Sequence, residues 1–122
     1  MKVYIGGIGA ESNWRTEFDA LTQSASLDIK EGNPDDKAEC DYLLYVITPK
    51  MKNVDAIINV VNDSNVQKGR TIFCTIDSEG ESHFTSHQEK SLVATGKMVE
   101  LNGGKYFKGL KNTVNYLTGA VN

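Results

Sequence analysis

The sequence predicts an α/β protein with a parallel β-sheet. Short runs rich in apolar and β-branched residues alternate along the chain with longer runs of helical spacing. One short run, DYLLYVI at 41–47, is almost entirely apolar. Strands that alternate with helices pair in parallel through right-handed crossovers. An apolar strand is typical of the middle of such a sheet, where both of its faces are covered.

Five strands are expected, each a short run bounded by turn residues. They are KVYI at 2–5, LDIK at 27–30, DYLLYVI at 41–47, RTIFCTI at 70–76 and, at an edge of the sheet, KMVEL at 97–101. The third ends at Thr48-Pro49, because proline cannot donate to a strand ladder. With helices between them, these strands predict a three-layer, flavodoxin-like sandwich with strand order 2-1-3-4-5.

The helices follow from apolar residues spaced three and four positions apart. Four are expected, namely from Asn13 through Leu21, over 54–65, from Thr85 through Val93, and at about 105–118. Asn13 and Thr85 precede two of them as candidate N-caps. The sequence NGG at 102–104 predicts a turn before the last helix.

Length and charge narrow the range of functions. A chain of 122 residues is expected to form one domain, 1–122. Its net charge of −3 argues against a binder of nucleic acid polymers or of membranes. No apolar run approaches the ~18 residues of a membrane span, and the run at the N-terminus is too short for a signal peptide. Cys40 and Cys74 have no metal-binding spacing and are expected as reduced thiols in a cytoplasmic protein.

Ligands of doubly wound sheets bind beside the carboxyl ends of the strands. The loops at 6–13, 31–40, 48–53 and 77–84 are therefore the expected site loops. Gly6 and Gly7, in the first of them, form either a plain tight turn or a cradle for a phosphate or sugar, and are candidate ligand-binding residues. The loop contains no lysine, which argues against an NTPase. His83 and His87 have no metal-site context and are expected in solvent, so no metal or other cofactor is expected.

Three segments together resemble one known family. KVYIGG at the start, CDYLLYVITP in the middle and VDAIINVVNDSN at 54–65 are similar to the nucleoside 2-deoxyribosyltransferase-like family, and look most like a short branch found in phages and bacteria. The resemblance covers roughly residues 2–76. It implies a protein that breaks or remakes an N-glycosidic bond, in which a helix glutamate attacks the anomeric carbon. It also implies a homo-oligomer, since the sites of this family are often completed by a neighbouring subunit.

The resemblance assigns roles to four residues. Tyr4 matches the tyrosine that helps to orient the nucleophile. Asp41 matches an aspartate associated with the base and proton transfer, although its position favours a role in capping a turn or pairing at the amino end of the sheet. Asn59 stands in the place of the nucleophilic glutamate, and Asn53 in the place of an accessory aspartate. Both acidic positions of this segment are therefore amides.

The two amides favour a nucleoside- or nucleotide-binding protein whose N-glycosidic chemistry is weakened or lost. An amide carries no charge with which to stabilise an oxocarbenium ion, but it can hydrogen-bond sugar hydroxyls as donor and acceptor. The alternative is an active deoxyribosyltransferase or nucleotide N-glycosidase that uses a relocated carboxylate such as Asp55. Asp63, at the far end of the same helix, is expected in solvent. A third interpretation is a structural or protein-binding domain that has kept only the fold.

Overall fold

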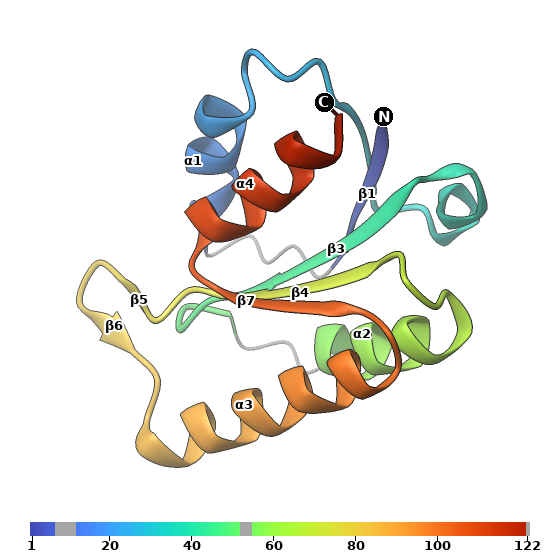
Figure 1. The fold of residues 1–122 in the computed structure, drawn as a ribbon. Coiled ribbons are helices and arrows are strands. Elements are labelled where there is room, and N and C mark those ends of the chain that lie inside the picture. Colours follow the sequence, from blue (N-terminus) through green and yellow to red (C-terminus); the bar gives the residue numbers. More distant parts are fainter. Residues whose placement is uncertain (7–11, 52–54, 122) are drawn as a thin grey trace.

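Five parallel strands form the sheet (Figure 1). The computed structural model describes residues 1–6, 12–51 and 55–121. In sheet order the strands are β2 (Asp28–Glu31), β1 (Lys2–Gly6), β3 (Tyr42–Ile47), β4 (Thr71–Thr75) and β7 (Lys105–Lys108), each paired in parallel with its neighbours. β3 is the central strand, as its sequence predicts, and all of its residues after Tyr42 are buried.

Helices cover both faces of this sheet (Figure 1). α1 (Trp14–Leu21) and α4 (Leu110–Val121) lie on one face, which we call the α1–α4 face. α2 (Asp55–Val66) and α3 (Ser86–Leu101) lie on the other, the α2–α3 face, together with the short 3₁₀ helix η1 (Pro34–Glu39). Successive strand residues point to opposite faces, so each strand contributes to two separate cores. The predicted three-layer, flavodoxin-like architecture is confirmed.

The fifth strand is not the segment that the sequence predicts. Residues 97–101 form the last turns of α3, and the strand is β7, where the pattern predicts the start of the final helix. Leu92, Gly96 and Val99 are buried at helical spacing. Glycine lowers helix propensity, but a Cβ at Gly96 would lie only 2.3 Å from a ring carbon of Tyr106. The absence of a side chain at Gly96 thus lets α3 approach β7.

Local signals fix both ends of α3. The Thr85 hydroxyl accepts a hydrogen bond from the Gln88 N–H at 3.1 Å, and the Gln88 side chain accepts one from the Thr85 N–H at 2.8 Å. This reciprocal pair is a capping box. At the other end Gly103 adopts a φ of 97°, which favours glycine, directly after the C-cap Asn102. The predicted cap at Thr85 and the predicted turn at 102–104 are confirmed.

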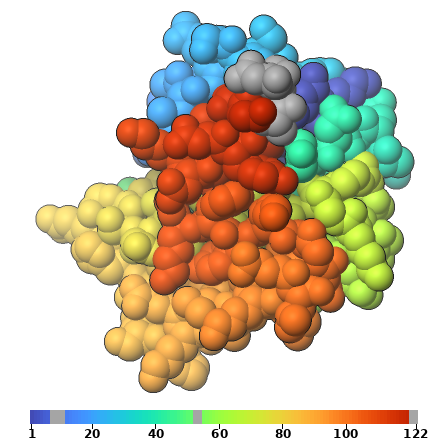
Figure 2. All heavy atoms as spheres, in the orientation of Figure 1, coloured from blue at the N-terminus to red at the C-terminus, as the bar shows by residue number. Residues whose placement is uncertain are grey.

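A small hairpin leaves the sheet after β4. Its strands, β5 (Ser78–Glu79) and β6 (Ser82–His83), pair in antiparallel fashion and project from the body of the molecule (Figures 1 and 2). His83 and His87 are exposed, as expected. Within the ranges given above, the structure has no helix with the length and apolar character that crossing a membrane requires.

Candidate functional site

The strand order places a topological switch point between β1 and β3. β1 leads into α1 on one face, whereas β3 leads towards α2 on the other, so the chain leaves these neighbouring strands in opposite directions. In doubly wound sheets the ligand binds at such a point, beside the carboxyl ends of the strands. Thr48, directly after β3, is fully buried, and its hydroxyl lies 3.3 Å from the hydroxyl of Ser12, just before α1.

Glu79 of the hairpin reaches the N-terminus of α1. Its carboxylate accepts hydrogen bonds from the Ser12 hydroxyl at 2.8 and 3.0 Å and from the Asn13 N–H at 2.7 Å. Burial raises the pKa of Glu79, but hydrogen bonds from Thr48, Asn13 and Ser12 and the charge of Lys50 outweigh it and hold the pKa below its usual value. An anion of the chain itself therefore occupies the end of α1 that attracts negative charge. Asn13 stands at the N-cap position, but its side chain makes no capping hydrogen bond.

Tyr4, the predicted orienting tyrosine, is buried on the α2–α3 face. Only 5% of its surface is exposed, and its ring centroid lies 6.5 Å from that of Tyr45 on β3. The ammonium of Lys37, from η1, lies 5.4 Å from the centre of the Tyr4 ring and 5.8 Å from that of Tyr45. This geometry suits a cation–π contact. η1 thus covers the residue that the resemblance assigns to the site.

Asp63 belongs to the same cluster, and the expectation that it lies in solvent is wrong. Its side chain is buried because helical spacing places it with Ala56 and Val60 on the inner side of α2. Its carboxylate accepts a hydrogen bond from the Tyr45 hydroxyl and lies 2.9 Å from the Lys37 ammonium. Ionised groups are buried when they are paired and hydrogen-bonded in this way.

The two tyrosines of this cluster are held in their neutral form. Burial raises the pKa of Tyr45 well above its usual value, and the hydrogen bond to Asp63 and the charge of Asp63 raise it further. Burial also raises the pKa of Tyr4, again with the charge of Asp63. At neutral pH both phenols are therefore hydrogen-bond donors and not bases.

The structure separates the remaining acidic and amide candidates. Asn59 and Asp55 are exposed on α2, whereas Asp63 of the same helix is buried. Asp41 instead lies at the amino edge of the sheet, where its carboxylate accepts a hydrogen bond from the Lys2 N–H at 2.8 Å. Asp41 thus lies at the opposite edge of the sheet from the switch point between β1 and β3.

Gly6 ends β1 and has a packing role. A Cβ at this position would lie 2.4 Å from a ring carbon of Tyr45, so the ring can occupy its place only beside a glycine. Close packing explains Gly6 without a ligand. Gly7 and Asn53, the other two candidate ligand-binding residues, lie outside the residues that the structure describes.

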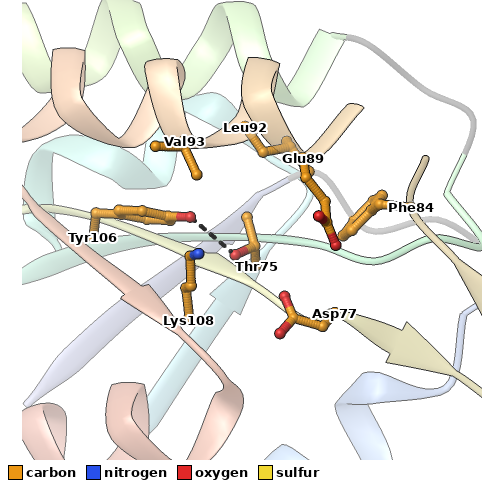
Figure 3. A pocket seen from close by; sticks show the side chains of 8 residues that line it. All are labelled: Thr75, Asp77, Phe84, Glu89, Leu92, Val93, Tyr106 and Lys108. Carbon is orange, nitrogen blue, oxygen red and sulfur yellow. Dashed lines mark hydrogen bonds between the residues drawn. The ribbon is translucent and has the colours of Figure 1, made fainter. Parts of the chain in front are cut away.

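A pocket at the carboxyl ends of β4 and β7 collects groups that the predicted site does not include (Figure 3). Its volume is about 70 Å³, enough for several water molecules. It is lined by Thr75, Asp77, Phe84, Glu89, Leu92, Val93, Tyr106 and Lys108. The hydroxyls of Thr75 and Tyr106 are 3.3 Å apart, and the Tyr106 ring stacks on Phe73 with 5.4 Å between centroids. Those contacts fix one wall of the pocket.

Three charged side chains surround this pocket. Asp77 follows β4, Glu89 lies in the first turn of α3, and Lys108 ends β7. Figure 3 shows the two carboxylates on one side and the Lys108 ammonium on the other, near the two hydroxyls. In the described part of the chain no side-chain hydrogen bond or ion pair engages these three charges. They are therefore available to a polar ligand at the edge where such sheets bind one.

Sequence reasoning finds only part of this pocket. The loop at 77–84 is one of the expected site loops, and it supplies Asp77 and Phe84. Glu89, Tyr106 and Lys108 are missed, the last two because 105–108 is predicted as helix. The usable signal is KYFK at 105–108, a short alternating run directly after a glycine turn, which places Lys108 at the end of a strand.

Metal and thiol chemistry find no support among the described residues. In those ranges no three His, Cys, Asp or Glu side chains are grouped so that they could hold a metal ion. Cys40 and Cys74 are buried and unpaired, and burial raises the pKa of Cys74 to about 11, so this thiol is a poor nucleophile. In comparisons with known proteins, no family model and no curated protein matches the chain.

Proposed function

We propose that the protein binds a nucleoside or nucleotide at the carboxyl edge of its sheet, with N-glycosidic chemistry that is weakened or lost. The observation that carries this proposal is the pocket in Figure 3. There two carboxylates, an ammonium and two hydroxyls surround a small cavity beside an aromatic ring. Doubly wound sheets bind nucleotides beside the carboxyl ends of their strands, at the switch point, and this pocket lies further along the same edge of the sheet.

Each group of the pocket has a counterpart on a nucleotide. The carboxylates of Asp77 and Glu89 can accept hydrogen bonds from sugar hydroxyls. Lys108 can bind a phosphate as a point charge, and the half-buried ring of Phe84 offers a surface on which a base can stack. A cavity of about 70 Å³ holds one part of such a ligand. The rest would extend along the carboxyl edge of the sheet towards the ends of β1 and β3.

The amide at position 59 supports the loss of chemistry. Asn59 is exposed on α2, where the resemblance calls for a glutamate, and an amide supplies neither a nucleophile nor a stabilising charge. Loss of a covalent nucleophile raises the barrier by on the order of 4–8 kcal/mol. The Tyr45 hydroxyl cannot take over this role, because it is buried, neutral and already donates to Asp63.

One observation favours an active enzyme as the second candidate. Asp77 and Glu89 both line the same small pocket (Figure 3), and glycosidic cleavage requires two carboxylates beside the scissile bond. Asp55, exposed at the start of α2, is a further acid towards the same edge. Such a pair would constitute a relocated catalytic centre.

Titration calorimetry tests binding, with 2′-deoxynucleosides and their 5′-monophosphates as probes. We expect tighter binding of the monophosphates, and Lys108→Met should weaken that binding by about 10-fold while leaving nucleoside binding unchanged. Lys105→Met is the matched control, since Lys105 is exposed at the opposite end of the same strand. The absence of heat with every probe, or equal effects of the two lysine variants, would contradict the proposal.

Base exchange distinguishes the two candidates. Incubated with a 2′-deoxynucleoside and a free acceptor base, the wild-type protein should give negligible exchange. Turnover by the wild type that Glu89→Gln or Asp55→Ala abolishes would establish the enzyme instead. Asn59→Glu restores a carboxylate at an exposed position, and a gain of exchange in this variant would place the ligand beside α2.

A further inference from the structure

The β5–β6 hairpin carries two residues of the pocket at its base. Asp77 comes directly before β5 and Phe84 directly after β6, and both line the pocket in Figure 3. Ser78 pairs with His83 in the antiparallel ladder of the hairpin. Asp77 and Phe84 flank that pair, so the placement of the hairpin decides where both of their side chains meet a ligand.

The hairpin has no apolar side chain with which to pack on the rest of the molecule. Residues 78–83 read SEGESH, and they project from the body of the molecule (Figure 1). An open hollow of about 300 Å³ lies between the hairpin and the start of α1, with Ser78 and Trp14 among its lining residues. A two-stranded hairpin is only marginally stable in water by itself. The placement of this hairpin therefore depends on specific polar contacts.

Glu79 supplies those contacts. Within the described chain, no other side chain of residues 78–83 forms a hydrogen bond or ion pair with the rest of the molecule. The Glu79 carboxylate accepts hydrogen bonds from the Ser12 hydroxyl at 2.8 and 3.0 Å and from the Asn13 N–H at 2.7 Å. Hydrogen bonds to an ionised carboxylate are roughly twice as strong as those between neutral groups. One side chain thus fastens the hairpin to α1.

The groups that hold Glu79 belong to well-packed parts of the fold. Asn13 stands at the N-cap of α1, directly before Trp14, which is buried in the core. Thr48, fully buried after β3, also donates a hydrogen bond to the Glu79 carboxylate. Two residues of chain span at most about 7 Å. Fastening Glu79 to these groups therefore confines Asp77, two residues earlier, as well.

We propose that Glu79 is a positioning residue of the pocket in Figure 3, which holds Asp77 and Phe84 in place by fastening the hairpin to α1. The inference rests on the proposed function, in which these two residues meet the sugar and the base. Glu79 does not line that pocket, so it acts through its neighbours. A site that is ordered before binding does not have to be ordered by the ligand, and this raises affinity.

Titration calorimetry with 2′-deoxynucleosides and their 5′-monophosphates tests this role. Glu79→Ala removes the carboxylate and should lower the affinity for nucleosides about 10-fold. The ratio of monophosphate to nucleoside affinity should stay unchanged, because Lys108 lies on β7 and not on the hairpin. Glu79→Gln retains the length of the side chain and one acceptor oxygen, so it should lose less affinity than Glu79→Ala.

Glu81→Ala is the matched control. Glu81 is exposed on the same hairpin, and its side chain forms no hydrogen bond or ion pair within the ranges that the structure describes. The substitution removes the same charge from the hairpin and should leave the affinity for nucleosides unchanged.

Ser12→Ala breaks the contact from its other side. Because it removes a hydroxyl that donates to Glu79, its effect on nucleoside affinity should be less than additive with that of Glu79→Ala. NMR relaxation of the ligand-free protein gives a measurement that does not depend on binding. The backbone order parameters of residues 78–84 should fall in Glu79→Ala and in Ser12→Ala, but not in Glu81→Ala.

The outcomes separate this inference from the proposed function. A wild type that binds none of the probes overturns the proposed function, and the positioning role with it. Equal affinities of the wild type and Glu79→Ala for nucleosides overturn the positioning role alone. That role is also overturned if Glu81→Ala weakens binding as much as Glu79→Ala, if the effects of Ser12→Ala and Glu79→Ala are strictly additive, or if residues 78–84 stay equally ordered in Glu79→Ala.

Discussion

The two faces of the sheet carry cores of different chemistry. On the α1–α4 face, strand residues such as Val3 and Ile5 pack against Trp14 and Phe18. The buried hydroxyls of this side, Thr22 and Thr113, are uncharged and donate to backbone carbonyls. On the α2–α3 face the same strands contribute phenols, and the apolar core borders a buried ionic pair. Neighbouring residues of a strand thus enter two environments that are stabilised in different ways.

The comparison shows what a polar core requires. The core of the α1–α4 face is stabilised by close packing of complementary side chains and by the exclusion of water. The cluster on the other face depends on partners from three elements, because η1 supplies Lys37, β3 supplies Tyr45 and α2 supplies Asp63. Removal of one partner leaves another buried group unsatisfied. The variants below distinguish the two kinds of core.

Phe18→Ala should have the largest effect on stability. The ring is fully buried on the α1–α4 face, and its edge meets the Trp14 ring with 5.7 Å between centroids. Truncation leaves a cavity and should lower the free energy of unfolding by about 3–5 kcal/mol. Urea unfolding monitored by fluorescence measures this loss. A loss below about 1 kcal/mol would mean that this face is not close-packed.

Lys37→Met should destabilise the other face by about 3 kcal/mol. It keeps the aliphatic length but removes the ammonium that lies 2.9 Å from the Asp63 carboxylate. The value lies at the low end for a buried pair because 19% of the Lys37 side chain remains exposed and water screens its charge. Lys90→Met on α3 is the control, since Lys90 is exposed and forms no ion pair among the described residues. Equal urea midpoints for both variants would refute the buried pair.

Tyr45→Phe should cost about 2 kcal/mol at neutral pH, because it deprives a buried carboxylate of its hydroxyl donor. The substitution should also change how the free energy of unfolding falls at alkaline pH. The pKa of Tyr45 is raised in the folded protein, so its contribution is complete below the usual pKa of about 10 and is lost as pH rises above that value.

The alkaline loss should therefore be smaller in Tyr45→Phe than in the wild type. The Cys74 thiol, on the α1–α4 face, also loses its contribution as pH rises towards its pKa of about 11. Both proteins retain Cys74, so the difference between their unfolding free energies isolates the tyrosine. If the unfolding free energies of the two proteins differ by the same amount at every pH from 8 upward, the pKa of Tyr45 is not raised by folding.

Gly6→Ala should have the smallest effect, about 1–2 kcal/mol, from overpacking. The added methyl group would lie 2.4 Å from the Tyr45 ring, so the ring or β1 must shift. Combined with Tyr45→Leu, the substitution should cost less than the sum of the two single changes, because the ring is then absent. Strict additivity of the unfolding free energies would indicate that Gly6 does not pack against Tyr45.

The sequence by itself determined the architecture of this protein. The apolar run at 41–47 identifies the central strand, and the alternation of strands with helices implies the parallel sheet order. The capping box at Thr85 can likewise be predicted from the sequence, because its two partners lie three residues apart. These features depend on local periodicity and on contacts between near neighbours in the chain.

Tertiary structure alone decided the identity of the fifth strand and the arrangement of the polar groups. Gly96 lets α3 pack closely against Tyr106 of β7, and Asp63 is buried because Lys37 and Tyr45 come to it from distant segments. The pocket of Figure 3 likewise joins the ends of β4 and β7 with the first turn of α3. Local sequence patterns do not reveal such pairings, because burial of a polar group depends on partners that only the folded chain brings within hydrogen-bonding distance.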